Sequence, residues 1–538
     1  MGKLFWRSGG LFAIALALTA CGGSNSPTSA QSASTSRGTL VENPPLRLAS
    51  LDATTLQADL AANASGAQLL QLVGNPTCGV DFYYFKFWTV GGAGEPTESS
   101  GALMVPTGSP PACTGPRPIV LYAHGTQTNK NANIANIADP GNTEGALIAA
   151  TFAAQGYIVV APNYAGYDIS TLGYHPYLNA TQQSDEMIDA LAAARTALPN
   201  TLSSATSDSG KLFITGYSQG GYVAMATERA MLAAGATVTA AAPMSGPYAL
   251  EAFGDAMFFG HVDLGATVFA PLLTTSYQHE YGDIYTATTD IYSPTYANGI
   301  DTLLPSTTPL ATIFAANLLP ETALFDSATP TVTIPNDPVL SQELTAALAV
   351  PSDPTNPDTP LFDLGFGPSY LITNAYRVSY ALDAAADPDG AVPTPSPGVP
   401  LAANPPQQTL RKAFYLNDMR YGGWAPSAPT LMCGGDQDPT VFFALNTGTM
   451  QAFWSATPAA PLISVLDVNA TPSGPFAPIQ QAFQQSQAAE FAYYESAAGG
   501  GYTAAQAQQL LVEGYHTAVA PFCSLAARSF FRSFFSQF

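Results

Sequence analysis

The chain has 538 residues, of which 47% are apolar and 10% are charged, so it is long enough to bury a large core and too apolar to remain disordered. Its formal net charge is −22. This charge disfavours nucleic-acid binding and electrostatic docking on anionic lipid, because phosphate groups would repel the protein.

The N-terminus has the pattern of an export signal. Lys3 and Arg7 precede an apolar run at residues 11–18. This run is shorter than the roughly 20 residues that a membrane span needs and is typical of a secretory signal peptide. It leads to Cys21 through a pattern that resembles a bacterial lipobox, which implies cleavage before Cys21 and lipidation of its thiol. We therefore expect a lipoprotein signal peptide at residues 1–20, with an ordinary signal peptide as the alternative.

The residues after Cys21 are rich in Gly, Ser, Thr and Pro, and we assign residues 21–50 to a flexible tether. The predicted location is the cell envelope, at the outer membrane where the organism has one, with release from the cell as a further possibility. In this interpretation the lipid anchor is the protein's one link to a membrane.

Four cysteines remain when Cys21 is set aside. An even number in an exported chain predicts two disulfides, for which three pairings exist. We favour Cys78–Cys113, because these residues flank two neighbouring strands, and Cys433–Cys523, for a reason given below. No Cys-x-x-Cys motif or His/Cys cluster indicates a metal site.

Strands and helices alternate between residues 78 and 245, which predicts an α/β fold with a mostly parallel sheet. Aromatic residues at 81–90 and a partner at 100–106 predict a hairpin. Apolar runs predict buried strands at 118–123, 157–162, 211–215 and 238–243. Helices are expected between them, at 146–155, at 184–198 with Ser184 as its N-cap, and at 222–233.

The pattern changes at residue 248. Residues 248–417 show little strand alternation and contain many prolines and aromatics. We interpret this span as a cap inserted into a hydrolase-like core whose two parts are residues 51–247 and 418–538. The second part resumes with strands at 429–433 and 462–468, followed by a helix at 504–513 that Gly514 is expected to close.

A candidate nucleophile lies in the sequence Gly216-Tyr217-Ser218-Gln219-Gly220. This Gly-x-Ser-x-Gly pattern falls between an apolar strand and a helix. A serine at such a tight turn stands clear of the sheet in strained backbone geometry, and the flanking glycines avoid clashes with neighbouring backbone. The pattern predicts that Ser218 is a catalytic nucleophile.

A serine hydroxyl needs a base, and the base needs an orienting acid. Of the five histidines, His516 alone follows the candidate acids, and we expect it on a loop just past a helix end. Asp438 is the preferred acid and Asp436 is its rival, since both follow a buried strand. A Cys433–Cys523 disulfide would clamp the acid-bearing strand to the segment behind His516.

Ester cleavage also needs hydrogen-bond donors for the developing oxyanion. The backbone N–H of Gln219, directly after the nucleophile, is one expected donor. The other is the N–H of Thr126, with Gln127 as its rival, in the loop after the first buried strand. We interpret His124 as a residue that orients this loop.

The order Ser218, Asp438, His516 on this framework resembles the α/β-hydrolase superfamily over about residues 82–519. Within it, Ala123-His124-Gly125-Thr126, the motif at 216–221 and the large insertion resemble the secretory lipase group related to Candida-type lipases. The resemblance implies lipase or carboxylesterase activity without a cofactor, and a helical cap over an acyl pocket.

We therefore expect an exported monomeric serine ester hydrolase that acts on apolar acyl or aromatic esters through an acyl-enzyme. A serine peptidase of the same fold is one alternative, since it would use the same triad. A surface-anchored binding module with a dead hydrolase fold is the other, and the presence of all three triad residue types disfavours it.

Overall fold

The computed structural model describes residues 36–353, 358–389, 401 and 404–535. The predicted signal peptide at residues 1–20 and the predicted lipidation site Cys21 lie outside the described residues. Among the residues that are described, no helix combines the length and apolarity of a membrane-spanning segment.

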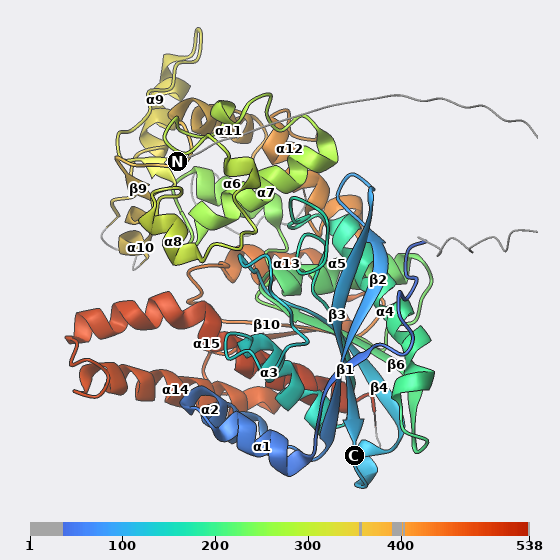
Figure 1. The fold of residues 1–538 in the computed structure, drawn as a ribbon. Helices are drawn as coiled ribbons and strands as arrows, with labels where there is room; N and C mark the ends of the chain where they lie inside the picture. Colours follow the sequence, from blue (N-terminus) through green and yellow to red (C-terminus); the bar gives the residue numbers. More distant parts are fainter. Residues whose placement is uncertain (1–35, 354–357, 390–400, 402–403, 536–538) are drawn as a thin grey trace, which may run out of the picture. The chain divides into compact units, whose positions relative to one another are not determined.

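A nine-stranded sheet forms the centre of the fold, in the order β1-β2-β3-β5-β4-β6-β7-β10-β11 (Figure 1). The first four strands of this order pair antiparallel and all later pairs are parallel. The strands are β1 (Leu46–Leu51), β2 (Gly79–Val90), β3 (Pro96–Thr107), β4 (Gly115–Ala123), β5 (Ile158–Pro162), β6 (Thr206–Tyr217), β7 (Ala240–Met244), β10 (Thr430–Gly434) and β11 (Ile463–Asp467). The predicted mostly parallel sheet is confirmed.

Helices cover both faces of the sheet, because its central strands are apolar on both sides. Ile119 and Leu121 of β4 belong to the core shared with α4 (Ala180–Thr201) and α5 (Gln219–Ala233). Val120 and Tyr122 of the same strand belong to the opposite core. That core is closed by α3 (Thr143–Thr151), α14 (Ala477–Glu495) and α15 (Ala504–Arg532), which lie across the sheet from α4 and α5 in Figure 1.

The assignment of residues up to 50 to a tether is wrong for the described residues 36–50. Strand β1 pairs with β2, and Leu40 forms a bridge with Phe87. Arg37 also makes an ion pair of 3.0 Å with Asp189. These contacts make the segment an edge of the sheet, and the helices α1 (Ala53–Ala61) and α2 (Ala64–Val73) follow it.

Two predicted helix boundaries are also wrong. Helix α4 begins at Ala180, because the Asn179 side chain accepts a hydrogen bond from the N–H of Gln182 (2.9 Å) and caps it, so Ser184 lies inside the helix. Helix α15 continues through Gly514 to Arg532. Its later residues, such as Phe522 and Phe531, are buried against the sheet, and this packing outweighs the poor helix propensity of one glycine.

Residues 248–417, the segment interpreted as a cap, contain helices and no strand of the nine-stranded sheet among their described residues. The helices gather in one group in Figure 1. They are α6 (Leu250–Phe258), α7 (Ala266–Tyr281), α8 (Leu310–Ala315), α9 (Pro338–Ala347), α10 (Thr359–Asp363), α11 (Asn374–Ala386) and α12 (Thr409–Asn417), with the short pair β8 (Phe325–Asp326) and β9 (Phe366–Gly367).

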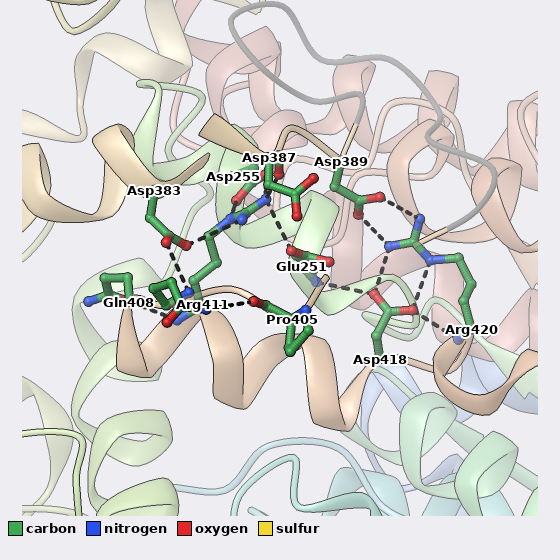
Figure 2. Close-up of polar contacts among 11 residues, drawn as sticks. Glu251, Asp255, Asp383, Asp387, Asp389, Pro405, Gln408, Arg411, Asp418 and Arg420 are labelled. Carbon is green, nitrogen blue, oxygen red and sulfur yellow. Dashed lines mark hydrogen bonds and ion pairs between the residues drawn. The ribbon is translucent and has the colours of Figure 1, made fainter. Parts of the chain in front are cut away.

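Buried ion pairs connect α6 and α12 with the chain that returns to the core (Figure 2). We call this group the cap ion network, and its members are Glu251, Asp255, Asp389, Arg411, Asp418 and Arg420. Arg411 donates two hydrogen bonds to Asp255, at 2.7 and 2.8 Å, and all six side chains are fully buried. Such planar, two-point contacts fix orientation as well as distance.

Candidate active site

Ser218 lies at the turn between β6 and α5, as the sequence pattern predicts. Its backbone has φ 60° and ψ −124°, a strained conformation for a residue with a side chain. A Cβ atom on Gly216 would lie 2.4 Å from the Ala123 oxygen, and one on Gly220 would lie 2.0 Å from the same oxygen. Only glycine fits these two positions, so the Gly-x-Ser-x-Gly spacing follows from the close approach of two backbones.

Three side chains form a hydrogen-bonded chain at this turn. His516 Nε2 lies 2.8 Å from Ser218 Oγ, and His516 Nδ1 lies 2.6 Å from Asp438 Oδ2. A proton on Nδ1 donates to the Asp438 carboxylate, which leaves Nε2 free to accept the proton of the Ser218 hydroxyl. The structure therefore brings together the three residues that the sequence analysis nominated.

The backbone orients the acid as well. Asp438 Oδ1 accepts hydrogen bonds from the N–H groups of Thr440 (2.9 Å) and Val441 (3.0 Å), and the residue is 4% exposed. The rival Asp436 is exposed, and its Oδ1 accepts a hydrogen bond from Asn469 (2.9 Å) instead. Of the two candidates, only Asp438 contacts the imidazole.

His516 lies within α15 and not on a loop, so the predicted setting of this residue is wrong. The ring projects from the helix toward β6, where the Tyr217 hydroxyl donates to the His516 carbonyl oxygen. Seven residues, or two helical turns, separate His516 from Cys523. Cys523 forms a disulfide with Cys433 of β10, and Cys78 forms one with Cys113. Both predicted pairings are confirmed, and the first of these bonds joins the acid-bearing strand to the base-bearing helix.

One predicted oxyanion donor directly follows Ser218, and the other belongs to a loop whose Gly125 lies close to Ser218. Gln219 is the first residue of α5, where a backbone N–H has no partner within the helix. In the facing loop, the Gly125 N–H donates to both Glu144 oxygens (3.0 and 3.2 Å), so it is already occupied. Thr126 follows it, with its hydroxyl 2.9 Å from that of Tyr177.

His124 and Glu144 hold this loop from behind. The two His124 ring nitrogens lie 2.7 Å from the Gly125 oxygen and 3.1 Å from the Asn163 oxygen. Burial raises the pKa of the Glu144 carboxyl, which also accepts a hydrogen bond from Tyr122 (2.8 Å). The expected role of His124 in orienting the loop fits these contacts, whereas Glu144 carried no recognisable pattern in the sequence.

His175 contacts the Gln219 side chain, which the sequence analysis missed. Burial lowers the pKa of His175 to about 3, so the ring is neutral. Its Nδ1 lies 2.8 Å from the Ala165 oxygen and carries the proton, which leaves Nε2 to accept from the Gln219 amide at 2.6 Å. No local pattern indicates this contact, because its partners are 44 residues apart.

A largely apolar pocket opens at Ser218. Its walls come from α6, α7, α12 and neighbouring segments, and Asp263 is the one acidic residue among the described residues that line it. The apolar lining includes Leu250, Phe253, Met257, Phe258, Phe269, Leu273, Leu410 and Phe414. Within the described ranges, no three His, Cys, Asp or Glu side chains are grouped as a metal site requires.

Comparisons with known proteins agree with this fold. The model of the prolyl oligopeptidase family matches residues 145–246, which include Ser218. No curated protein is similar enough to be matched. A ligand-bound form of the rice cell wall degrading esterase LipA from Xanthomonas oryzae is similar over 92% of this chain and 98% of its own, with 23% identity and a TM-score of 0.62.

Three further structures are similar. Another crystal structure of LipA covers 80% of this chain and 91% of its own, with 25% identity and a TM-score of 0.58. A protein of Legionella pneumophila covers 93% and 98%, with 20% identity and a TM-score of 0.54. Candida antarctica lipase A covers 80% and 76%, with 10% identity and a TM-score of 0.43, a likeness too distant to support an argument. Together with the sheet order, the LipA and Legionella structures show that the chain has the α/β-hydrolase fold.

Proposed function

We propose that this α/β-hydrolase-fold protein is a serine ester hydrolase with Ser218 as nucleophile, His516 as base and Asp438 as orienting acid. The observation that carries the proposal is the unbroken chain of two hydrogen bonds from Ser218 Oγ through His516 to Asp438, at 2.8 and 2.6 Å. The strained turn that presents Ser218 to an apolar pocket supports the same role.

The mechanism follows from the proton positions. His516 Nε2 takes the proton of Ser218 as Oγ attacks the ester carbonyl, and the Asp438 carboxylate stabilises the resulting imidazolium. The N–H groups of Gln219 and Thr126 stabilise the oxyanion. His516 then protonates the leaving alcohol, and water releases the acyl group by the reverse sequence. These steps use side chains and backbone of the protein together with one water molecule.

The choice of acyl group in this proposal is based on the pocket at Ser218. Its lining of Phe, Leu and Met side chains suits an apolar acyl or aromatic acyl group. The similarity to LipA, an esterase, supports an ester over a peptide as substrate.

Export is part of the proposal. Two disulfides favour an extracellular or periplasmic environment over a reducing cytosol. We place a diacyl group on Cys21, which would attach a monomeric enzyme to the cell envelope. Labelling with radioactive palmitate in the producing cell would test this, because Cys21→Ser should abolish the label.

The test of the activity is hydrolysis of p-nitrophenyl esters, from acetate to palmitate, by the purified protein and by Ser218→Ala. We expect Ser218→Ala to lower kcat/KM by a factor on the order of 10⁴ or more, since the remaining groups provide only residual catalysis. A fluorophosphonate should label the wild-type protein and not this variant. Circular dichroism and thermal unfolding should coincide for the two proteins. Ester turnover that does not depend on Ser218 would overturn the assignment.

A serine peptidase is the second candidate, because the prolyl oligopeptidase model matches the segment around the nucleophile. The same triad would serve it. Labelling of Ser218 by the fluorophosphonate together with turnover of peptide p-nitroanilides, and no turnover of any ester, would favour this candidate.

A further inference from the structure

Asp263 is a buried acid that the mechanism above does not use. It lies between α6 and α7 and lines the same pocket as Ser218 and Gln219. The residue is 5% exposed, and its Oδ1 has no hydrogen-bond partner among the described residues. Buried polar atoms are nearly always paired, so an unpaired one on a residue that lines a substrate pocket points to a group on the substrate.

The backbone holds Asp263 in this position. Its N–H donates to the Met257 sulfur (3.4 Å), and the N–H of the next residue, Leu264, donates to the Pro439 oxygen (3.0 Å). The second bond places Asp263 beside the loop that carries Asp438. The backbone of Asp263 is therefore held near the acid loop by contacts that do not involve the carboxyl group.

The surroundings of Asp263 favour its neutral form. No cation forms an ion pair with it within the described part of the chain, and the acid that faces it is Asp438. Burial first, and the negative charge of Asp438 second, raise the pKa of Asp263 well above its ordinary value. A protonated carboxyl donates one hydrogen bond and accepts others, as a hydroxyl group also does.

We propose that Asp263 is a specificity-determining residue that hydrogen bonds a hydroxyl group on the acyl part of the substrate. The preferred substrates would then be esters of hydroxy acids, aliphatic or phenolic, and not esters of plain hydrocarbon acids. This inference rests on the proposed ester hydrolase function, because that function places the acyl group in this pocket.

The test uses p-nitrophenyl esters in matched pairs, each pair with and without one hydroxyl on the same acyl group. A set of hydroxyl positions along the chain, plus one phenolic acid, covers the reach of Asp263. The quantity measured is the kcat/KM of the hydroxylated ester divided by the kcat/KM of its plain partner. We expect a ratio of about ten or more for at least one pair, because a plain acyl group leaves the buried carboxyl unpaired.

Two variants distinguish how Asp263 acts. Asp263→Asn keeps a donor and an acceptor and should keep most of the preference, whereas Asp263→Leu should bring the ratio close to one. Asp283→Leu, which removes an exposed acid just after α7, should leave the ratio as in the wild type. Fluorophosphonate labelling of Ser218 in each variant confirms that the fold and the nucleophile are intact.

A wild-type ratio near one for every pair would overturn the proposal, even if the leucine variant does not fold. So would a preference that survives in a folded Asp263→Leu. A preference for aminoacyl esters that Asp263→Asn abolishes would show that the group acts as a carboxylate toward a cation, which also contradicts it. Turnover of any ester in the set that depends on Ser218 keeps the proposed function in each of these cases, whereas no Ser218-dependent turnover of any ester would overturn both.

Discussion

The cap and the active site bury acidic side chains in opposite ways. In the cap ion network, Arg411 faces Asp255 at 2.7 Å and Glu251 at 3.0 Å, so each acid has a cation beside it. In the pocket, Asp263 has an acid as its charged neighbour and one oxygen without a partner. The acids of the first arrangement lie beside a cation of the protein, and among the described residues Asp263 does not.

This difference separates groups that hold the structure from groups that react or bind. Burial raises the pKa of Glu251 to about 9 and that of Asp389 to about 7, even though a guanidinium lies near each of them. Asp255 makes the two-point contact with Arg411, and Glu251 lies beside the same guanidinium. At the active site, two backbone N–H groups donate to one oxygen of Asp438, and the other oxygen contacts His516.

The largest predicted effect concerns the acid at the active site. Asp438→Asn should lower kcat by about 10⁴-fold, because an amide that donates to Nδ1 stabilises the wrong histidine tautomer. Asp436→Asn is the matched control and should change kcat less than twofold, since Asp436 is exposed. Ester turnover of both variants, at equal concentrations of folded protein, decides between the two. A larger loss for Asp436→Asn would reverse the assignment of the acid.

The second prediction removes a cation from the cap. Arg411→Met should lower the free energy of unfolding by about 3–5 kcal/mol, because it leaves buried carboxyl groups without a partner. Arg195→Met removes a partly exposed pair of 3.6 Å with Asp208 and should cost less than about 1 kcal/mol. Denaturant titration measures both. The double variant Arg411→Met/Asp255→Leu should recover part of the loss, and equal losses for the two arginines would contradict the role of the network.

The third prediction concerns the pH dependence caused by another buried acid. Glu228 of α5 accepts a hydrogen bond from Thr430 (2.9 Å) and has no ion pair among the described residues. Burial raises its pKa from the ordinary value of 4.5 to about 8. Between these values the folded protein holds a proton that the unfolded chain has lost, so this group makes stability fall as the pH rises through that window.

Glu228→Gln removes this dependence. We expect the Tm of the wild-type protein to fall more steeply from pH 5 to pH 8 than that of Glu228→Gln. At pH 8 the variant should have the higher Tm. Glu343→Gln, at an exposed position, should follow the wild type. Parallel curves for wild type and Glu228→Gln would show that Glu228 is ionised in the folded protein.

The nucleophile and much of the core could be predicted from the sequence because their constraints are local. The glycines around Ser218 are required because any larger residue would clash with the adjacent backbone, and the apolar runs form strands that are buried on both faces. Asp438 and His516 followed from residue order combined with the chemistry that a serine needs. The setting of His516 did not, because α15 is held as a helix by distant core contacts and not by its own propensity.

The cap ion network and the pocket acid could not be predicted for a similar reason. Arg411 and Asp255 are 156 residues apart, and neither lies in a recognisable pattern. Asp263 stands alone in the sequence, and only the fold shows that its carboxyl is buried beside Asp438. The contact between His175 and Gln219 likewise depends on a loop and the start of α5, which the fold brings together.

The disulfide between Cys433 and Cys523 also makes the motion of the base observable. Both cysteines are fully buried, so a reductant in solution can reach the bond only when α15 moves away from β10. Local openings of this kind cost less free energy than global unfolding. A small thiol would therefore reduce this bond in the folded protein at a rate that depends on how often α15, which carries His516, separates from β10, which precedes Asp438.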